Sequence, residues 1–526
     1  MLINPPIDRK VNSMQFKFKM ISSLPKLAWC AHIQKESDII EVFHGPWVET
    51  TQNFFFEGAW AGNYSSGRFA SSCSCIGSGA ALENSTIEFA TPSFPKEKLC
   101  LIRLDKKIVI SNSIAFCLSE ANDKPDLNYP FYTFDFMSYT KGLNKLVNRV
   151  PTQRGRFIEL YYCCNFTIDS KLTIKKYPKK QPDQFCNYTH YLTYIKNEIN
   201  EIYQNANHQL RTQTYKPLST ISSGYDSPAC TVLAQDVGCI EALTFKSSRA
   251  QFNQASDSGI EIANILRVKV KECERLDFMN RNDFPEAEFL AVGTGGEDVV
   301  MSSFEDNIAG TLFFTGFGGG TVWARFHSDL KGASNYVTKD FSGSTLLEFR
   351  LRLGFINLPI PLLTLSRYPS LYRISNSDEM KPWQLNGTTY DRPIARRIVE
   401  DKGVPRSLIG MSKQAATQPF YHNIPLKDTM AKDSYCDFNK FIENIELNIN
   451  LGQRVAFVIG PYFYSVRYFT ARIVAKMLKI VGIYLALPFF FAERYYKPFS
   501  KNILAFHWGI LKVSPRYFYS EKDQLE

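Results

Sequence analysis

Residues 188–315 alternate short apolar runs with segments of helical periodicity, and this alternation limits the fold more than any other feature of the chain. Within 188–210 the apolar residues recur about every 3.6 positions, which predicts a helix. The segments that follow are strand-like at 218–222, 240–245, 268–273 and 312–315, with helices expected from 227 and over 256–266. Strands that alternate with helices at this spacing predict an α/β domain with a doubly wound parallel sheet.

The residues before this domain carry short strand signals separated by turn residues. They lie at 54–60, 99–104, 108–113, 156–163 and 171–175, and 101–110 reads as a β-hairpin. A basic, Pro-containing stretch at 175–182 reads as a linker, and 340–450 reads as mainly helical, most clearly over 391–402. We therefore expect an N-terminal segment (1–50), a strand-rich α+β domain (51–180), the α/β domain (186–450) and a mainly helical C-terminal extension (451–526).

Composition excludes several classes of protein. The 526 residues are 44% hydrophobic and 21% charged, which excludes a disordered, collagenous or coiled-coil chain and predicts two to four domains. The 12 cysteines are irregularly spaced and lack a second Cys/His pair for zinc, so we expect free thiols. The first 30 residues show no convincing signal peptide, which favours a cytoplasmic location.

The C-terminal extension holds most of the net charge of +10. It carries eleven Lys or Arg against four acids, together with 18 aromatic residues. Its longest apolar run, 480–492, contains Pro488 and is shorter than the roughly 20 residues of a spanning helix. The extension suits either a helical layer packed on the α/β domain or peripheral contact with an anionic membrane through 473–520. Apolar runs this continuous argue against a nucleic-acid partner.

Leu218–Pro228 is the segment most informative about chemistry. An apolar strand ends in Ser222-Ser223-Gly224-Tyr225-Asp226-Ser227, and a helix follows. A turn of small residues before a helix lets backbone N–H groups close on a phosphate, and Asp226 there fits a divalent cation held between it and the phosphates. A helix N-cap turn, which any α/β protein contains, explains the same residues, and spacing alone does not decide between the two.

This segment resembles the Ser-Gly-Gly-x-Asp-Ser pyrophosphate loop (PP-loop) of the N-type ATP pyrophosphatases, and the chain resembles their asparagine synthetase-like branch. The resemblance implies an Ntn-type glutaminase-like domain followed by a HUP-like synthetase domain that adenylates a carboxylate with ATP and Mg²⁺. It also implies further positions: adenine contacts from Leu243, Thr244 and Phe245, an acidic helix at 257–266, a second glycine loop at 315–323 with Gly316, Phe317 and Gly318, and a C-terminal arm at 390–413 whose lysine is Lys413.

The chain departs from the family pattern in both halves. Ser223 replaces the first glycine of the PP-loop, while Phe317, Gly320 and Thr321 stand where the second loop of the family carries acids. Ntn glutaminases need a cysteine directly after the initiator Met, because its freed α-amine is the base for its own thiol. Residue 2 is Leu, so we expect the first domain to be a scaffold without glutaminase activity.

The resemblance implies an ATP-dependent carbon–nitrogen ligase. A small molecule or peptide supplies the carboxylate, which becomes an acyl-adenylate, and an amine or ammonia then attacks it with release of AMP and pyrophosphate. Asp226 would hold Mg²⁺, the backbone of Ser222–Ser227 the pyrophosphate, and Lys413 the developing charge. The alternative is a catalytically silent homologue that binds a nucleotide and acts as an interaction protein. Loss of the second-loop acids favours this alternative, and retention of Asp226 and Ser227 favours the enzyme.

For two further groups of charged residues, the sequence is compatible with either a functional or a structural role. Arg392, Arg396 and Arg397 fit either a cluster that faces phosphates or a solvated helix face. Glu305 and Asp306 lie shortly before the second loop, where they either replace its missing acids or occupy a turn or helix face.

Overall fold

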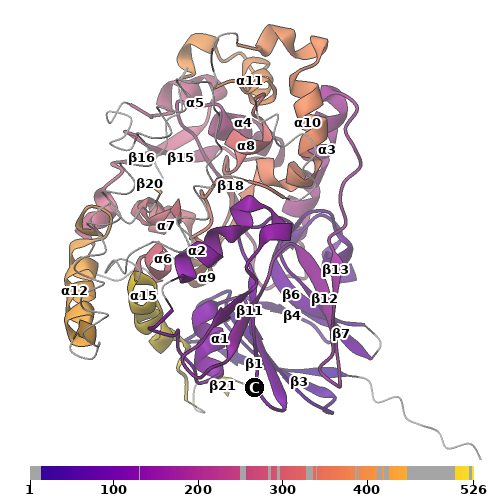
Figure 1. The fold of residues 1–526 in the computed structure, drawn as a ribbon. Helices are drawn as coiled ribbons and strands as arrows, with labels where there is room; N and C mark the ends of the chain where they lie inside the picture. The colour runs from indigo at the N-terminus through magenta and orange to yellow at the C-terminus, as the bar shows by residue number, and fades with distance from the viewer. Residues whose placement is uncertain are drawn as a thin grey trace, which may run out of the picture.

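The structure of the protein is a computed structural model. It describes residues 14–83, 85–129, 131–248, 256–281, 286–292, 296–326, 336–338, 340–385, 388, 390–410, 418–419, 426–446, 504–520 and 524–525. The fold is mixed α/β, with strand-rich sheets in the N-terminal part and a parallel sheet flanked by helices in the following part (Figure 1).

Two sheets form the N-terminal part. The larger has the order β10-β11-β8-β9-β2-β3-β1-β21, with β1 (Gln15–Ile21), β2 (Trp29–Gln34), β3 (Ile39–His44), β8 (Leu99–Arg103), β9 (Lys107–Ser111), β10 (Arg149–Pro151), β11 (Phe157–Tyr161) and β21 (Gln524–Leu525). The smaller has the order β13-β12-β7-β6-β5-β4, with β4 (Glu49–Thr50), β5 (Phe54–Trp60), β6 (Cys75–Glu83), β7 (Thr86–Ala90), β12 (Cys164–Asp169) and β13 (Ile174–Pro178). Apolar side chains of both sheets share one core, among them Trp29, Phe55 and Phe166.

The structure places the first boundary differently from the sequence prediction. Residues 15–50 form β1 to β4, and β2 pairs with β9 while β4 pairs with β5, so the described residues up to 50 belong to the same two sheets as the strands that follow. Phe16, Phe18 and Met20 of β1 alternate with Lys17 and Lys19, a strand pattern that the sequence prediction missed. The hairpin of β8 and β9 is confirmed, with Leu101 opposite Ile110. The basic stretch expected as a linker begins inside β13.

The doubly wound parallel sheet is confirmed. Its order is β16-β15-β14-β18-β19, and every neighbouring pair is parallel, with β14 (Lys216–Thr220), β15 (Glu241–Phe245), β16 (Lys269–Cys273), β18 (Thr311–Thr315) and β19 (Ile356–Pro359). The chain moves outward from β14 to β16, then returns beside β14 as β18. The strand order therefore reverses between β14 and β18, and such a switch point opens a crevice at the carboxyl ends of the strands.

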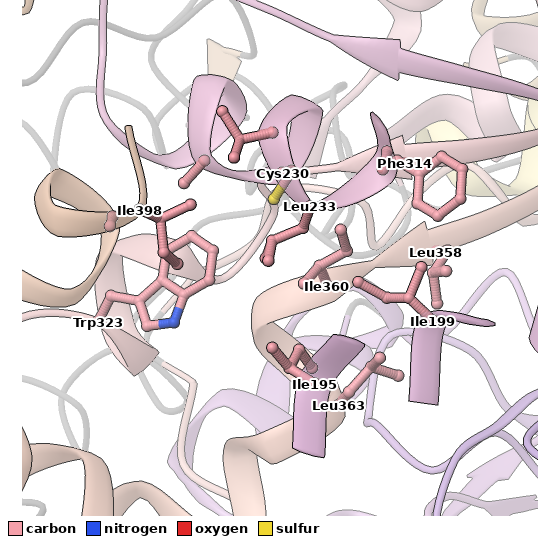
Figure 2. Packing of buried hydrophobic residues seen from close by; sticks show 14 of the residues in the cluster. Ile195, Ile199, Cys230, Leu233, Phe314, Trp323, Leu358, Ile360, Leu363 and Ile398 are labelled. Carbon is pink, nitrogen blue, oxygen red and sulfur yellow. The ribbon is translucent and has the colours of Figure 1, made fainter. Parts of the chain in front are cut away.

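Helices cover both faces of this sheet because successive strand residues point to opposite sides. On one face, Phe314 and Leu358 pack against Ile195 and Ile199 of α3 (Tyr188–Ala206) together with residues of α4 (Asp226–Ala234) and α11 (Pro393–Glu400) (Figure 2). On the other, Leu218 and Phe313 pack against Phe304 and against Phe349 of α9 (Leu347–Leu353). The remaining elements include α1 (Ile114–Glu120), α2 (Tyr132–Phe136), α5 (Ile260–Leu266), α7 (Glu305–Ile308), α8 (Gly319–Val322), α10 (Tyr368–Ser375), β17 (Gly296–Glu297) and β20 (Gln418–Pro419).

Buried charges join the N-terminal sheets to the α/β part. The guanidinium of Arg350 on α9 pairs with Glu57 of β5 at 2.7 Å and with Glu97 at 2.8 Å. On the same helix, the carboxylate of Glu348 accepts hydrogen bonds from the hydroxyls of Ser113 (2.6 Å) and Tyr517 (2.7 Å). The two parts therefore share one continuous interface.

The described part of the C-terminal extension packs into the molecule. Helix α15 (Ala505–Val513) lies beside α6 (Glu286–Val292), whose residues 287–291 have positive φ, and near α12 (Lys432–Glu446) (Figure 1). Trp508 is fully buried, and β21 pairs with β1. Residues 473–503, which hold the apolar run, lie outside the described residues. Of the helices that the structure describes, none has the length and apolar character needed to cross a membrane.

Candidate functional site at the sheet switch point

The two predicted loops meet at the switch point. Ser222–Ser227 follows β14, and Gly316–Thr321 follows β18, its parallel neighbour. A Cβ added to Gly316 would lie 2.9 Å from the backbone nitrogen of Ser227, and one added to Gly319 would lie 2.4 Å from Cγ of Asp226. Glycines at these positions therefore allow an approach that a larger residue would block.

Internal hydrogen bonds hold the first loop. The hydroxyl oxygens of Ser222 and Ser227 lie 2.8 Å apart, and the backbone N–H of Gly224 donates to Ser222 Oγ over 3.3 Å. Ser223 Oγ donates to Asp257 Oδ1 over 2.8 Å, which ties the loop to the segment before α5. Ser222, Ser223, Gly224 and Ser227 are only partly buried, so the loop is fixed in shape while part of its surface stays accessible.

Helix α4 begins at Asp226, immediately after this turn. The cap residue is Tyr225, whose side chain makes no capping hydrogen bond, so Asp226 is not the N-cap that the alternative reading of the sequence proposed. Its carboxylate instead forms an ion pair with Arg392, which precedes α11. The guanidinium of Arg392 also lies over the ring of Tyr390, 4.5 Å from its centroid. These contacts join the first loop to the 390–413 arm.

The arginines of α11 do not form a solvated helix face. Arg392 and Arg396 are buried; Arg396 pairs with Asp391 at 2.8 Å and donates from Nε to the hydroxyl of Tyr225 over 3.0 Å. Arg397 is stacked on aromatic rings and pairs with Glu379. Arg392 is the member of the group that reaches the carboxylate of the first loop.

The second loop is shaped by a residue that the sequence prediction missed. The backbone N–H of Gly318 donates to Asp340 Oδ2 over 3.1 Å, and φ of Gly318 is +81°. Phe317 packs against the apolar layer beneath the sheet. Asp340 brings an acid to a loop whose own acids are missing, but it comes from a later segment, and no spacing rule links it to Gly318.

The predicted adenine contacts lie in β15. The side chains of Leu243, Thr244 and Phe245 are all buried, and the ring of Phe245 packs against that of Phe304 in a tilted arrangement with centroids 4.8 Å apart. Thr244 Oγ1 accepts a hydrogen bond from the N–H of Gly259 over 3.0 Å. These side chains are packed into the protein and hold β15 beside the first loop. An adenine ring bound at β15 would therefore contact the backbone of the strand rather than these side chains.

Asp257 is a buried carboxyl group beside the first loop whose pKa is shifted. Burial raises its pKa to about 6, although the hydrogen bonds from Ser223 oppose that rise. The sequence prediction included Asp257 only as the start of the acidic helix, and its contact with Ser223 spans 34 residues. A carboxyl group with this pKa changes charge in the mildly acidic range.

The remaining candidates are placed as follows. Glu305 pairs with Arg281 at 2.5 Å and with Arg352 at 2.6 Å, so it serves a structural ion cluster, and Asp306 is exposed. Lys413 lies outside the described residues. The structure thus brings together the two loops, Asp226 and the start of the arm.

The described residues do not fit a protein-held magnesium ion. A divalent cation needs several oxygen ligands from carboxylates, carbonyls or water. The carboxylate of Asp226 is already paired with a guanidinium, and within the described ranges no cluster of three or more His, Cys, Asp or Glu could hold a metal ion.

No protein-family model and no curated protein matches this chain. The resemblance to asparagine synthetases therefore stays a prediction from the motifs of the sequence.

Proposed function

We propose that this protein binds the phosphates of ATP at the switch point and uses ATP to activate a carboxylate. The observation that supports this most is the meeting of the Ser222–Ser227 and Gly316–Thr321 loops between β14 and β18, where open α/β sheets bind ligands. The 3-2-1-4-5 order of the parallel strands supports the HUP-like assignment, and the facing N-terminal sheets support the Ntn-like one.

The chain supplies the groups that such a reaction needs. Backbone N–H groups at the start of α4 and the hydroxyls of Ser222 and Ser227 bind the β- and γ-phosphates, assisted by the positive end of the helix dipole. The substrate carboxylate attacks the α-phosphorus, the bond to the β-phosphate oxygen breaks, and pyrophosphate leaves. Positive charge at the loop stabilises the leaving pyrophosphate. In this proposal Lys413 neutralises charge at the reacting carboxylate.

The second half of the reaction forms an amide. An amine, or ammonia from solution, attacks the acyl-adenylate carbonyl and displaces AMP. In this proposal the N-terminal sheets act as a scaffold and supply no ammonia of their own. The cytoplasmic location stays a prediction, as does membrane contact through residues 473–520. Co-sedimentation of the full chain with anionic liposomes tests the latter.

A second candidate is a nucleotide-binding homologue without turnover. The pairing of Asp226 with Arg392 favours it, because that carboxylate is occupied by a guanidinium, and Gly320 supplies no replacement acid. In this case the protein binds ATP and serves as an interaction partner for another chain.

Pyrophosphate release from ATP in the presence of candidate carboxylic acids and amines separates the two candidates. The proposal expects release that depends on both ATP and the acid, and a loss of at least about tenfold in Asp226→Asn. Saturable ATP binding without release above that variant, for every acid offered, would establish the silent homologue instead. Release of ammonia from glutamine would overturn the scaffold role of the first domain.

A further inference from the structure

Arg392 occupies the place beside Asp226 where a metal ion was expected. Its guanidinium comes from the residue before α11, lies over the ring of Tyr390 and pairs with the carboxylate at the start of α4. The side chain of Arg392 is 6% exposed and that of Asp226 is 19% exposed. The pair therefore sits just below the surface of the first loop.

A buried guanidinium needs partners for its donors, since removing it from water is costly. Arg392 has five N–H donors. Its Nη1 donates to Asp226, and its other guanidinium nitrogens make no hydrogen bond to any described residue. A phosphate oxygen pair matches the planar fork of arginine, and such contacts are stronger than neutral hydrogen bonds. The free side of the guanidinium thus has the chemistry of a phosphate site.

The same pair disfavours a metal ion. A divalent cation on Asp226 would stand within a few ångströms of the guanidinium charge, where repulsion is large at the reduced dielectric of a partly buried site. The second loop offers glycine at residues 318 to 320, and its neighbouring acid, Asp340, accepts from the N–H of Gly318. The remaining N–H donors of Arg392, rather than a bound cation, are therefore the groups of the described site that suit phosphate oxygens.

We propose that Arg392, positioned by Asp226, replaces the protein-bound divalent cation, so that the site binds a nucleoside triphosphate without magnesium. This inference rests on the proposed function, because it states whether ATP binding at the Ser222–Ser227 loop requires Mg²⁺. Arg392 is a phosphate-binding residue in this account, and Asp226 is a positioning residue that acts through it.

Calorimetric titration of ATP into the full chain, with Mg²⁺ and separately with EDTA, tests the inference. We expect wild type to bind in EDTA with a Kd within about threefold of the value in Mg²⁺. Arg392→Gln should weaken binding in EDTA by about tenfold or more, and Arg392→Lys by an intermediate factor, since lysine keeps the charge without the fork. Arg373→Gln, an exposed arginine on α10, is the matched control and should bind as wild type does.

Each outcome separates the inference from the proposed function. Binding in Mg²⁺ that disappears in EDTA would overturn the role of Arg392 and leave the ATP site standing. Absence of binding in both buffers would overturn the ATP site itself. Thermal unfolding of each variant shows whether it is folded, and Arg392→Lys keeps the test decisive if Arg392→Gln does not fold. Unchanged binding in a folded Arg392→Lys and Arg392→Gln would also refute the inference.

Discussion

At the scale of single residues, the candidate site depends on contacts between parts of the chain that are far apart in sequence. Asp226 and Arg392 are 166 positions apart, and Ser223 and Asp257 are 34 apart. The sequence pattern indicated the two loops because each is a short run of neighbouring residues, with serines, a glycine and an aspartate in the first and glycines in the second. It could not pair Asp226 with Arg392, since an arginine on a helix face and an arginine beneath a loop have the same sequence signature.

Asp257 makes stability depend on pH. Burial raises its folded-state pKa to about 6, above the ordinary value near 3.8, so the folded state binds more protons between these values. Stability is therefore lost as pH rises through this window, by roughly 2–3 kcal/mol once the group is ionised. Asp257→Asn removes this loss.

Denaturant unfolding of Asp257→Asn and wild type from pH 4 to pH 7.5 measures the effect. The stability of the variant relative to wild type should rise with pH from about 4 and level off once the pH exceeds the folded-state pKa of about 6. In Ser223→Ala this levelling-off should move to higher pH, because the hydroxyl that favours the ionised form is gone. A difference between variant and wild type that does not change with pH would contradict the assignment.

Gly319→Ala tests the close approach of the two loops. The new Cβ would lie 2.4 Å from Cγ of Asp226, so the loops must separate, at a cost of about 1–3 kcal/mol in unfolding free energy. ATP binding should also weaken in Gly319→Ala, because the two loops no longer meet. Gly224→Ala is the milder control, because its nearest neighbour is the hydroxyl of Tyr390 at 3.3 Å. Equal effects of the two variants on unfolding would contradict the predicted contact.

At the scale of elements, periodicity predicted the α/β part well because its strands are short buried runs and its helices carry one apolar face. α3, α4 and α5 and the four predicted strands β14, β15, β16 and β18 all appear close to the expected positions. β1 was missed although Phe16 and Phe18 alternate with lysines as in a half-buried strand. Lys19 pairs with Glu41 on β3. Local patterns could not predict that β21, at the far end of the chain, pairs with β1.

Helix α15 should contribute strongly to folding. Trp508 is fully buried, and its indole N–H donates to Asp437 over 3.2 Å, so Trp508→Ala should cost about 3–5 kcal/mol. Leu511 lies on the same helix and is 48% exposed, so Leu511→Ala should change stability by less than about 1 kcal/mol. Urea unfolding followed by far-UV circular dichroism measures both. Similar losses for the two variants would show that α15 is not packed as described.

At the scale of the whole molecule, Arg350 holds the N-terminal sheets to the α/β part. Arg350→Met leaves Glu57 and Glu97 buried beside each other without a cation, at a cost of about 3–5 kcal/mol. Arg103→Met removes a more exposed partner of Glu159 and should cost under about 1 kcal/mol. Unfolding in guanidinium chloride measures the loss of stability in the two variants. Independent unfolding of the two parts in wild type would contradict a shared interface.

The central claim is that the switch-point loops bind the phosphates of ATP, and a crystal structure of the chain with a non-hydrolysable ATP analogue tests it most directly. The account predicts triphosphate density against the backbone of residues 222–227 and within hydrogen-bonding distance of Arg392. Nucleotide density anywhere else, or an empty loop at a saturating concentration of the analogue, would contradict it.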